Sequence, residues 1–310
     1  MKSQTEETVE RLLDPTVSVE PKYTTKSKTA KSAIDIVVIL LIFGIGEFVG
    51  GLVGVLLGTL VSKALGDTSK IWETALALLF ASLFTILFFI GSRCLLTKSH
   101  WLEKPDFIGE INPFRLRWRY APLMMIATFA GAIAIGCLGQ ALGVEDKMED
   151  AIHALANNPI GVLTITLIGP LGEEIIFRHG ILGGMLRRGV TPWIAILVSS
   201  LLFGIIHWNP IQTLFASALG VMLGILYTKS QSIIPSLLYH IINNSFAVFV
   251  MWIAEITGKE QDPTEELLNT PPVFISVTIV AAAISIPIYI YYWRKPSIVS
   301  QKSHASHEPN

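Results

Sequence analysis

Long runs of apolar residues, separated by short polar segments, dominate the sequence. A helix that crosses a bilayer needs about 20 mostly apolar residues. The runs that meet this need are 33–62, 71–96, 120–143, 159–186, 191–208, 211–228, 232–254 and 273–293. The pattern predicts an all-α integral membrane protein, a polytopic helical bundle with about eight transmembrane helices.

Polar segments flank this apolar region at both ends of the chain. The first residues do not lead into the apolar core of a signal peptide. We expect residues 1–30 to form a polar, disordered N-terminal tail and residues 296–310 to form a polar C-terminal tail. Residues 31–295 between them are expected to form one membrane domain.

The overall composition agrees with a membrane protein and excludes several other classes. Hydrophobic residues make up 51% of the chain and charged residues only 15%, whereas a soluble domain carries about 25% charged residues. A disordered protein needs the opposite composition. The net charge of −1 gives no reason to expect a nucleic-acid partner. The lipid bilayer is therefore the first partner that the sequence predicts.

Basic residues gather at alternate ends of the apolar runs, and acidic residues follow the third and seventh runs. The lysines and arginines concerned are Lys22, Lys26, Lys28, Lys31, Lys98, Lys104, Arg115, Arg117, Arg119, Arg187, Arg188, Lys229, Arg294 and Lys295. Cytoplasmic loops of membrane proteins collect lysine and arginine. The distribution predicts a protein of the cell membrane with both termini in the cytoplasm.

The first apolar run carries a repeat of small residues and one acid. Its glycines recur at every fourth position: Gly46, Gly50, Gly54 and Gly58. Small residues at this spacing let two membrane helices approach closely. Glu47 lies in the same run, and we expect it to be paired because an ionisable residue inside a membrane is costly.

The fourth run contains two adjacent glutamates and an arginine. Glu174 and Arg178 are four residues apart, so on a helix they can pair. Glu173 then points roughly 100° away from that pair, and a carboxylate in a low-dielectric site can act as a general base. Pro170 suits the first turn of a helix. It makes Gly169–Gly172 a candidate break, after which a new helix starts at the glutamates.

Two histidines and an asparagine lie in later runs. His207 ends the fifth run, and His240 and Asn244 share one helical face of the seventh. Counted from the connecting turns at about 1.5 Å per residue, Glu173 and His207 each lie about 25 Å along their helices. His240 and Asn244 lie about 15 and 21 Å along theirs. The count predicts that the four groups converge, although it also places His207 beside the turn at Asn209–Pro210.

These residues form three spaced motifs that resemble those of a known family. Glu173-Glu174-x-x-x-Arg178 is followed by Phe203-x-x-x-His207 and then by His240-x-x-x-Asn244. The order, the spacing and the placement on the fourth, fifth and seventh runs are similar to the CPBP family of intramembrane proteases. This family comprises the type II CAAX prenyl endopeptidases and the bacteriocin-processing Abi proteins. The resemblance covers residues 115–256, which we expect to form the protease core.

The resemblance implies a role for each motif residue. Glu173 and His207 would activate the attacking water, and His240 and Asn244 would stabilise the oxyanion. Glu174 and Arg178 would hold the cavity together or bind the polar end of the substrate. The implied enzyme is a CAAX-type endopeptidase that cleaves a membrane-associated or lipidated protein or peptide.

The residues leave the cofactor and two other functions open. Glu173, His207 and His240 could ligate Zn²⁺ with a fourth position for water, while a metal-free glutamate mechanism fits equally well. Buried ionisable residues also make the proton relays of transporters, although the ionisable cluster is confined to one half of the chain, without the inverted repeat of many transporters. A non-catalytic scaffold or immunity protein remains a further alternative.

Overall fold

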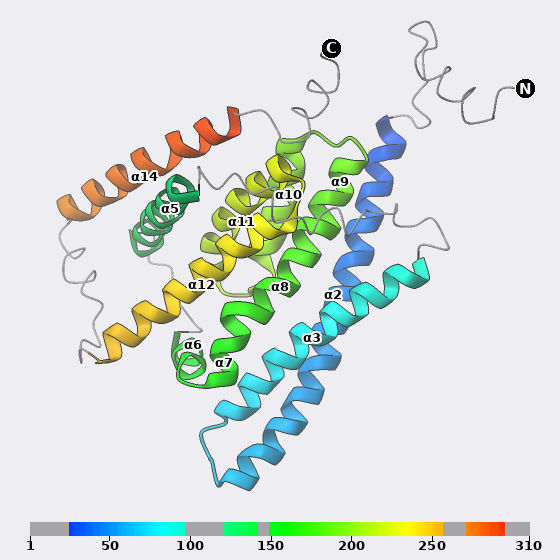
Figure 1. Ribbon diagram of the computed structural model, residues 1–310, viewed down its shortest axis with the longest axis vertical. Helices are drawn as coiled ribbons and strands as arrows, with labels where there is room; N and C mark the ends of the chain where they lie inside the picture. The colour runs from blue at the N-terminus through cyan, green and yellow to red at the C-terminus, as the bar shows by residue number, and fades with distance from the viewer. Residues whose placement is uncertain (1–24, 97–120, 142–148, 257–270, 295–310) are drawn as a thin grey trace, which may run out of the picture.

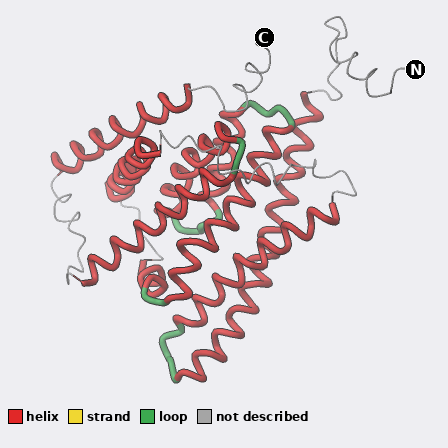
Figure 2. Tube along the Cα trace, viewed as in Figure 1, coloured by secondary structure: helices red, strands yellow, loops and turns green. Residues whose placement is uncertain are grey.

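The computed structural model describes residues 25–96, 121–141, 149–256 and 271–294, and every element in these ranges is a helix (Figure 2). The α-helices are α2 (Thr25–Leu65), α3 (Ile71–Leu96), α5 (Ala121–Ala141), α6 (Glu149–Ala156), α7 (Pro159–Leu163), α8 (Gly169–Glu173), α9 (Gly183–Arg187), α10 (Pro192–Ile205), α11 (Pro210–Ser230), α12 (Ile233–Ile256) and α14 (Pro271–Arg294). Two π-helical segments, η4 (Thr164–Ile168) and η5 (Glu174–Leu182), join α7, α8 and α9 into one continuous element. The predicted all-α fold is confirmed.

Each of the eight predicted runs carries a helix. Among the described residues, six helical stretches are long and apolar enough to cross a membrane, and α5 and α10 carry shorter apolar stretches, Pro122–Ile135 and Pro192–Ile205. The polytopic membrane architecture is therefore confirmed. Two details differ from the expectation. Helix α2 already begins at Thr25, and α6 is an additional short helix, which buries Leu155 while His153 stays exposed.

Helices α2 and α3 form an antiparallel hairpin along one side of the molecule (Figure 1). The glycine repeat of α2 faces α3: a Cβ atom added to Gly46 would lie 2.6 Å from the Cα atom of Thr85. No side chain fits in such a contact, so the glycines let the two backbones touch. The close packing expected for this repeat is found, and it fixes the register of α2 against α3.

The remaining helices complete a bundle around the α7–α9 element (Figure 1). Helices α10 and α11 pack against each other, and α5 pairs with α14, where the Ser285 hydroxyl donates a 2.8 Å hydrogen bond to the Ala127 carbonyl. Phe177, Phe203 and Tyr227, which lie on η5, α10 and α11, are among the largest fully buried side chains and belong to one hydrophobic cluster. The α7–α9 element, which carries both glutamates, therefore lies in the core of the bundle.

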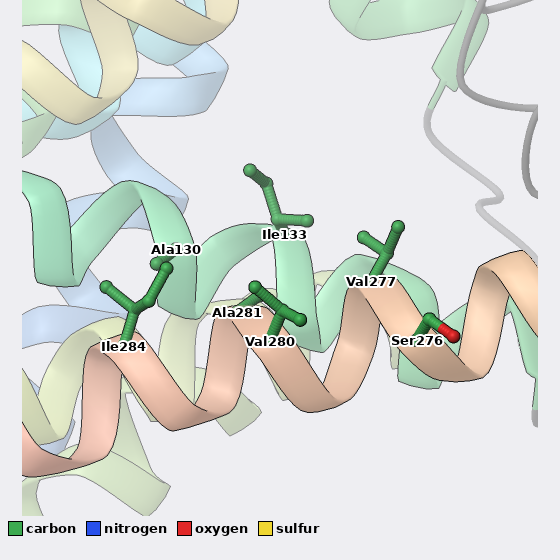
Figure 3. Close-up of a pocket in the computed structure, with 7 residues that line it drawn as sticks. All are labelled: Ala130, Ile133, Ser276, Val277, Val280, Ala281 and Ile284. Carbon is green, nitrogen blue, oxygen red and sulfur yellow. The ribbon is translucent and has the colours of Figure 1, made fainter.

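The outer faces of the helices are apolar, as a bilayer requires. Leu41, Phe48 and Leu56 on α2 are each at least 60% exposed. An apolar groove of about 350 Å³ opens between α5 and α14, lined by residues such as Ala130, Ile133 and Ile284 (Figure 3). None of the ionisable candidates lines this groove, so the groove is not the candidate active site.

Candidate active site

Glu174 and Arg178 form a fully buried ion pair on the inner face of η5. The Glu174 Oε2 and Arg178 Nε atoms are 3.4 Å apart, and both side chains are 0% exposed. The guanidinium carbon of Arg178 also lies 4.7 Å from the centre of the Phe203 ring on α10. A cation over an aromatic face is attracted by the ring quadrupole, so Phe203 provides part of the environment that keeps this charge buried.

His240 on α12 lies between the two glutamates. Its Nδ1 atom is 3.3 Å from Glu174 Oε1, and its Nε2 atom is 3.4 Å from Glu173 Oε2. The His240 side chain is 3% exposed, whereas that of Glu173 is 24% exposed. A carboxylate on one ring nitrogen fixes the orientation and proton position of an imidazole. Glu174 therefore orients His240, and Glu173 is the carboxylate of this group that faces the more open side.

His207 lies just after the end of α10, in the turn that leads to α11. Its Nδ1 atom is 2.8 Å from the Phe203 carbonyl oxygen. In the neutral ring, Nδ1 is then the donor and Nε2 the acceptor. Within the described parts of the chain, no hydrogen bond or ion pair joins His207 to Glu173. The expected direct approach of these two residues is thus not seen in this arrangement.

The Phe203 ring connects His207 to the rest of the site. The ring meets His207 edge-on at 5.2 Å and His240 edge-on at 5.7 Å, centre to centre. The sequence identified Phe203 only as a motif position and did not predict that its ring contacts both histidines. Its spacing of four residues from His207 was the available signal, since side chains at that spacing share one face of a helix.

Asn244 contacts the main chain of the α7–α9 element. Its amide nitrogen donates a 3.0 Å hydrogen bond to the carbonyl oxygen of Ile165 in η4. Its amide oxygen accepts a 3.2 Å hydrogen bond from Asn243. His240 and Asn244 thus both project from α12 toward the α7–α9 element, as their spacing predicted. His240 contacts this element at the glutamates, and Asn244 contacts it at Ile165.

The two π-helical segments interrupt the α7–α9 element on either side of Glu173. A π turn changes which carbonyls have a helical donor, and such turns are frequent at functional sites. Neighbouring side chains bind several of these carbonyls. Ser199 on α10 donates to the Phe177 carbonyl at 2.9 Å, and Arg187 donates to the His179 carbonyl at 3.1 Å. The break predicted at Gly169–Gly172, with a new helix from the glutamates, is wrong: Gly169–Glu173 is α-helical within a continuous element, and the changes of helical register lie on either side of it.

Glu47 on α2 is a further acid close to this site. It accepts a 2.9 Å hydrogen bond from the Thr85 hydroxyl, so it is paired as expected. Glu47 also lies within electrostatic range of Glu173. The tight α2–α3 contact at Gly46 holds it there. Sequence reasoning gave Glu47 no place in the site, because its position in the first run gave no information about proximity to the fourth.

Glu173, His207 and His240 are the candidate ligands of a metal ion. A zinc site takes three or four nitrogen, sulfur or oxygen ligands. Among the described residues, no group of three or more His, Cys, Asp or Glu side chains is arranged to hold a metal ion. Glu173 and His240 are adjacent, whereas His207 contacts the Phe203 carbonyl and the Phe203 ring. The candidate Zn²⁺ ligands therefore do not fit a metal site in this arrangement, and the chemistry below is derived from the side chains alone.

Comparisons with known proteins agree with the motifs. Residues 155–246 match the family described as Type II CAAX prenyl endopeptidase Rce1-like. The chain is 28% identical over 156 residues to the candidate membrane peptidase YdiL of Bacillus subtilis (strain 168), an alignment that covers 48% of this chain and 62% of YdiL. It is 25% identical over 177 residues to the membrane-embedded CAAX protease MroQ of Staphylococcus aureus (strain USA300), which covers 53% of this chain and 70% of MroQ. No solved structure matches the chain.

The matched segment contains all the candidate site residues, from Glu173 to Asn244. The chain spans a little under two thirds of YdiL. The family match thus covers the central helices, which also carry the buried polar cluster. The resemblance drawn from the three motifs is confirmed: the central helices of this chain are similar to the Rce1-like type II CAAX prenyl endopeptidases.

Proposed function

We propose that the protein is an intramembrane endopeptidase that hydrolyses a peptide bond of a membrane-associated or lipidated protein or peptide. The observation that carries this proposal is the contact between Glu173 and His240, with Glu174 on the other ring nitrogen. A partly exposed carboxylate beside an oriented imidazole is a group that can take up and return a proton. Such a group is what water needs in order to attack an amide.

Glu173 is the general base in the proposed reaction. It accepts a proton from water while the water oxygen bonds to the carbonyl carbon of the substrate. The tetrahedral intermediate then collapses, the carbon–nitrogen bond breaks, and the proton passes to the leaving nitrogen. His207 shares in this activation in the proposal, since catalytic hydrogen bonds are often loose before the substrate binds and tighten afterwards.

His240 and Asn244 are the proposed donors to the oxyanion. The Nε2 atom of His240 already lies beside Glu173, close to where the negative charge would develop. The Asn244 amide carries two N–H groups, and the Ile165 carbonyl occupies one of them. Fixed donors in a site that excludes water stabilise a developing oxyanion strongly. Arg178 supports these residues indirectly, because it pairs with the Glu174 carboxylate that orients His240.

Peptides released in cells test the proposed function. Membrane peptide profiles of cells that express the wild type should contain fragments that are missing when the protein carries Glu173→Ala. The matched control is Glu73→Ala, which removes a carboxylate from the first turn of α3, and its profile should equal that of the wild type. Identical profiles for the wild type and Glu173→Ala would favour a non-catalytic scaffold. A proton-coupled transporter would instead lose transport, with no missing fragment.

The proposed orientation places both termini in the cytoplasm of the cell. In a variant without Cys94 and Cys137, a cysteine at Gln231, between α11 and α12, should react with an impermeant thiol reagent only from the cytoplasmic side. A cysteine at Thr68, between α2 and α3, should react only from outside. The reason is that an odd number of spans separates the two turns and that lysine and arginine mark the cytoplasmic side. Labelling of the two sites with the sides exchanged would invert the proposed orientation.

A further inference from the structure

Pro170 explains why the Ile165 carbonyl needs a donor from another helix. In the π-helical segment η4, the N–H of Gly169 bonds to the Thr164 carbonyl, five residues earlier. The next bond of this register would run from residue 170 to Ile165. Proline has no N–H group. In this register, residue 170 therefore cannot serve as the main-chain donor of the Ile165 carbonyl.

Such a carbonyl is costly at this depth of a membrane protein. No water in the bilayer core is available to bind it, so each polar main-chain group has to be satisfied within the protein. Hydroxyls of the same segment bind earlier carbonyls: Thr164 donates to Ile160 and Thr166 donates to Val162, each at 2.8 Å. Asn244 serves Ile165 from α12 at 3.0 Å.

The orientation of the Asn244 amide suits this bond. Asn243 donates a 3.2 Å hydrogen bond to the amide oxygen of Asn244. The oxygen is thereby occupied, and the amide nitrogen points to Ile165. Helix α12 thus contacts the α7–α9 element at two places, at Ile165 through Asn244 and at Glu173 through His240. Two contacts between a pair of helices fix both their relative rotation and their relative depth.

We infer that Asn244 positions Glu173 and that Pro170 makes this bond necessary: Pro170 frees the Ile165 carbonyl, and the Asn244 bond to that carbonyl sets the place of Glu173 relative to His240. This inference rests on the proposed function. Pro170 touches no reacting atom and acts only by leaving the carbonyl to Asn244. The contribution of Asn244 is thereby divided into a positioning part through Ile165 and a part from its second N–H.

The experiment restores the missing donor within the main chain. Asn244→Ala should lower the rate at which cells release the Glu173-dependent membrane peptides by about 10²–10³-fold. Pro170→Ala alone should stay within about threefold of the wild type, because residue 170 then supplies an N–H for Ile165. The double variant Pro170→Ala/Asn244→Ala should release these peptides at least about ten times faster than Asn244→Ala does, since the carbonyl again has a donor.

A second measurement follows the bond without relying on activity. In detergent, Asn244→Ala should lower the midpoint of thermal unfolding by about 2–4 °C, because a buried carbonyl loses its partner. The double variant should regain most of this shift. The matched control is Pro192→Ala, which changes another proline at the start of a helix. Combined with Asn244→Ala, it should restore neither the midpoint nor the peptide release.

Two results would overturn the inference. No recovery of either quantity in the double variant would show that Pro170 and Asn244 are not coupled. Recovery of the midpoint without recovery of peptide release would show that Asn244 acts only on the reacting atoms. A failure of the proposed function gives a different result: the peptide profiles of the wild type and Glu173→Ala would be identical. The unfolding midpoints would still show whether Pro170 and Asn244 are coupled.

Discussion

Glu173→Gln is expected to abolish peptide cleavage while the protein still folds. Glutamine has nearly the same shape as glutamate but cannot accept a proton from water, and the loss of a general base costs about 10²–10⁴-fold in rate. The Glu173 side chain is 24% exposed, so the change does not leave a deeply buried charge without its partner. Turnover by the purified protein and its thermal unfolding in detergent should be measured on the same preparation.

His207→Ala should give the same result if His207 shares in the activation of the water. Its ring is held by the Phe203 carbonyl and packs edge-on against the Phe203 ring, so removal of the imidazole leaves the helices in place. Cleavage at nearly the wild-type rate by either variant would remove that residue from the water-activating pair. If His207→Ala loses both cleavage and the folded state, the test uses His207→Asn, whose amide N–H can still donate to the Phe203 carbonyl.

The second large effect concerns the buried pair of Glu174 and Arg178. Either single change to alanine should destabilise the protein by about 3–5 kcal/mol, because it leaves the other charge buried and uncompensated. Both charges are fully buried and 3.4 Å apart. The double change should cost less than the sum of the single changes. A double-mutant cycle on the free energy of unfolding measures this difference.

The pair of Arg188 and Asp35 provides the comparison for this cycle. It joins the end of α9 to α2, and its side chains are 11% and 13% exposed. Both side chains are more exposed than those of Glu174 and Arg178, so the coupling of Arg188 with Asp35 should be smaller than that of the buried pair. Strictly additive losses for Glu174 and Arg178 would show that the two side chains do not interact in the folded protein.

The helical runs were predictable because the bilayer imposes a length and a composition on every span. The pairing of Glu174 with Arg178 was equally accessible, since it depends only on a spacing of four residues within one helix. The glycine repeat of the first run similarly predicted a close helix contact, now seen at Gly46 and Thr85. Each of these features is local in the sequence or repeats along it.

The relative depths of the catalytic candidates were harder to predict. The count of about 1.5 Å per residue assumes an unbroken α-helix. The fourth run contains two π-helical segments, which change its register, and α10 ends at Ile205, before His207 is reached. The count placed Glu173 opposite His207 and predicted that His240 and Asn244 converge with them. The structure brings Glu173 beside His240, while no hydrogen bond or ion pair joins Glu173 to His207 among the described residues. The bond from Asn244 to Ile165 depends on this same register and could not be foreseen.

The most direct measurement follows the fate of the attacking water. The purified protein, reconstituted in liposomes, would be given a peptide identified from the cellular profiles, in water enriched in oxygen-18. The account predicts that the wild type releases two fragments and that the new carboxyl group carries one oxygen-18 atom, while Glu173→Gln releases neither fragment. Release of the same fragments at the same rate by both proteins would contradict it.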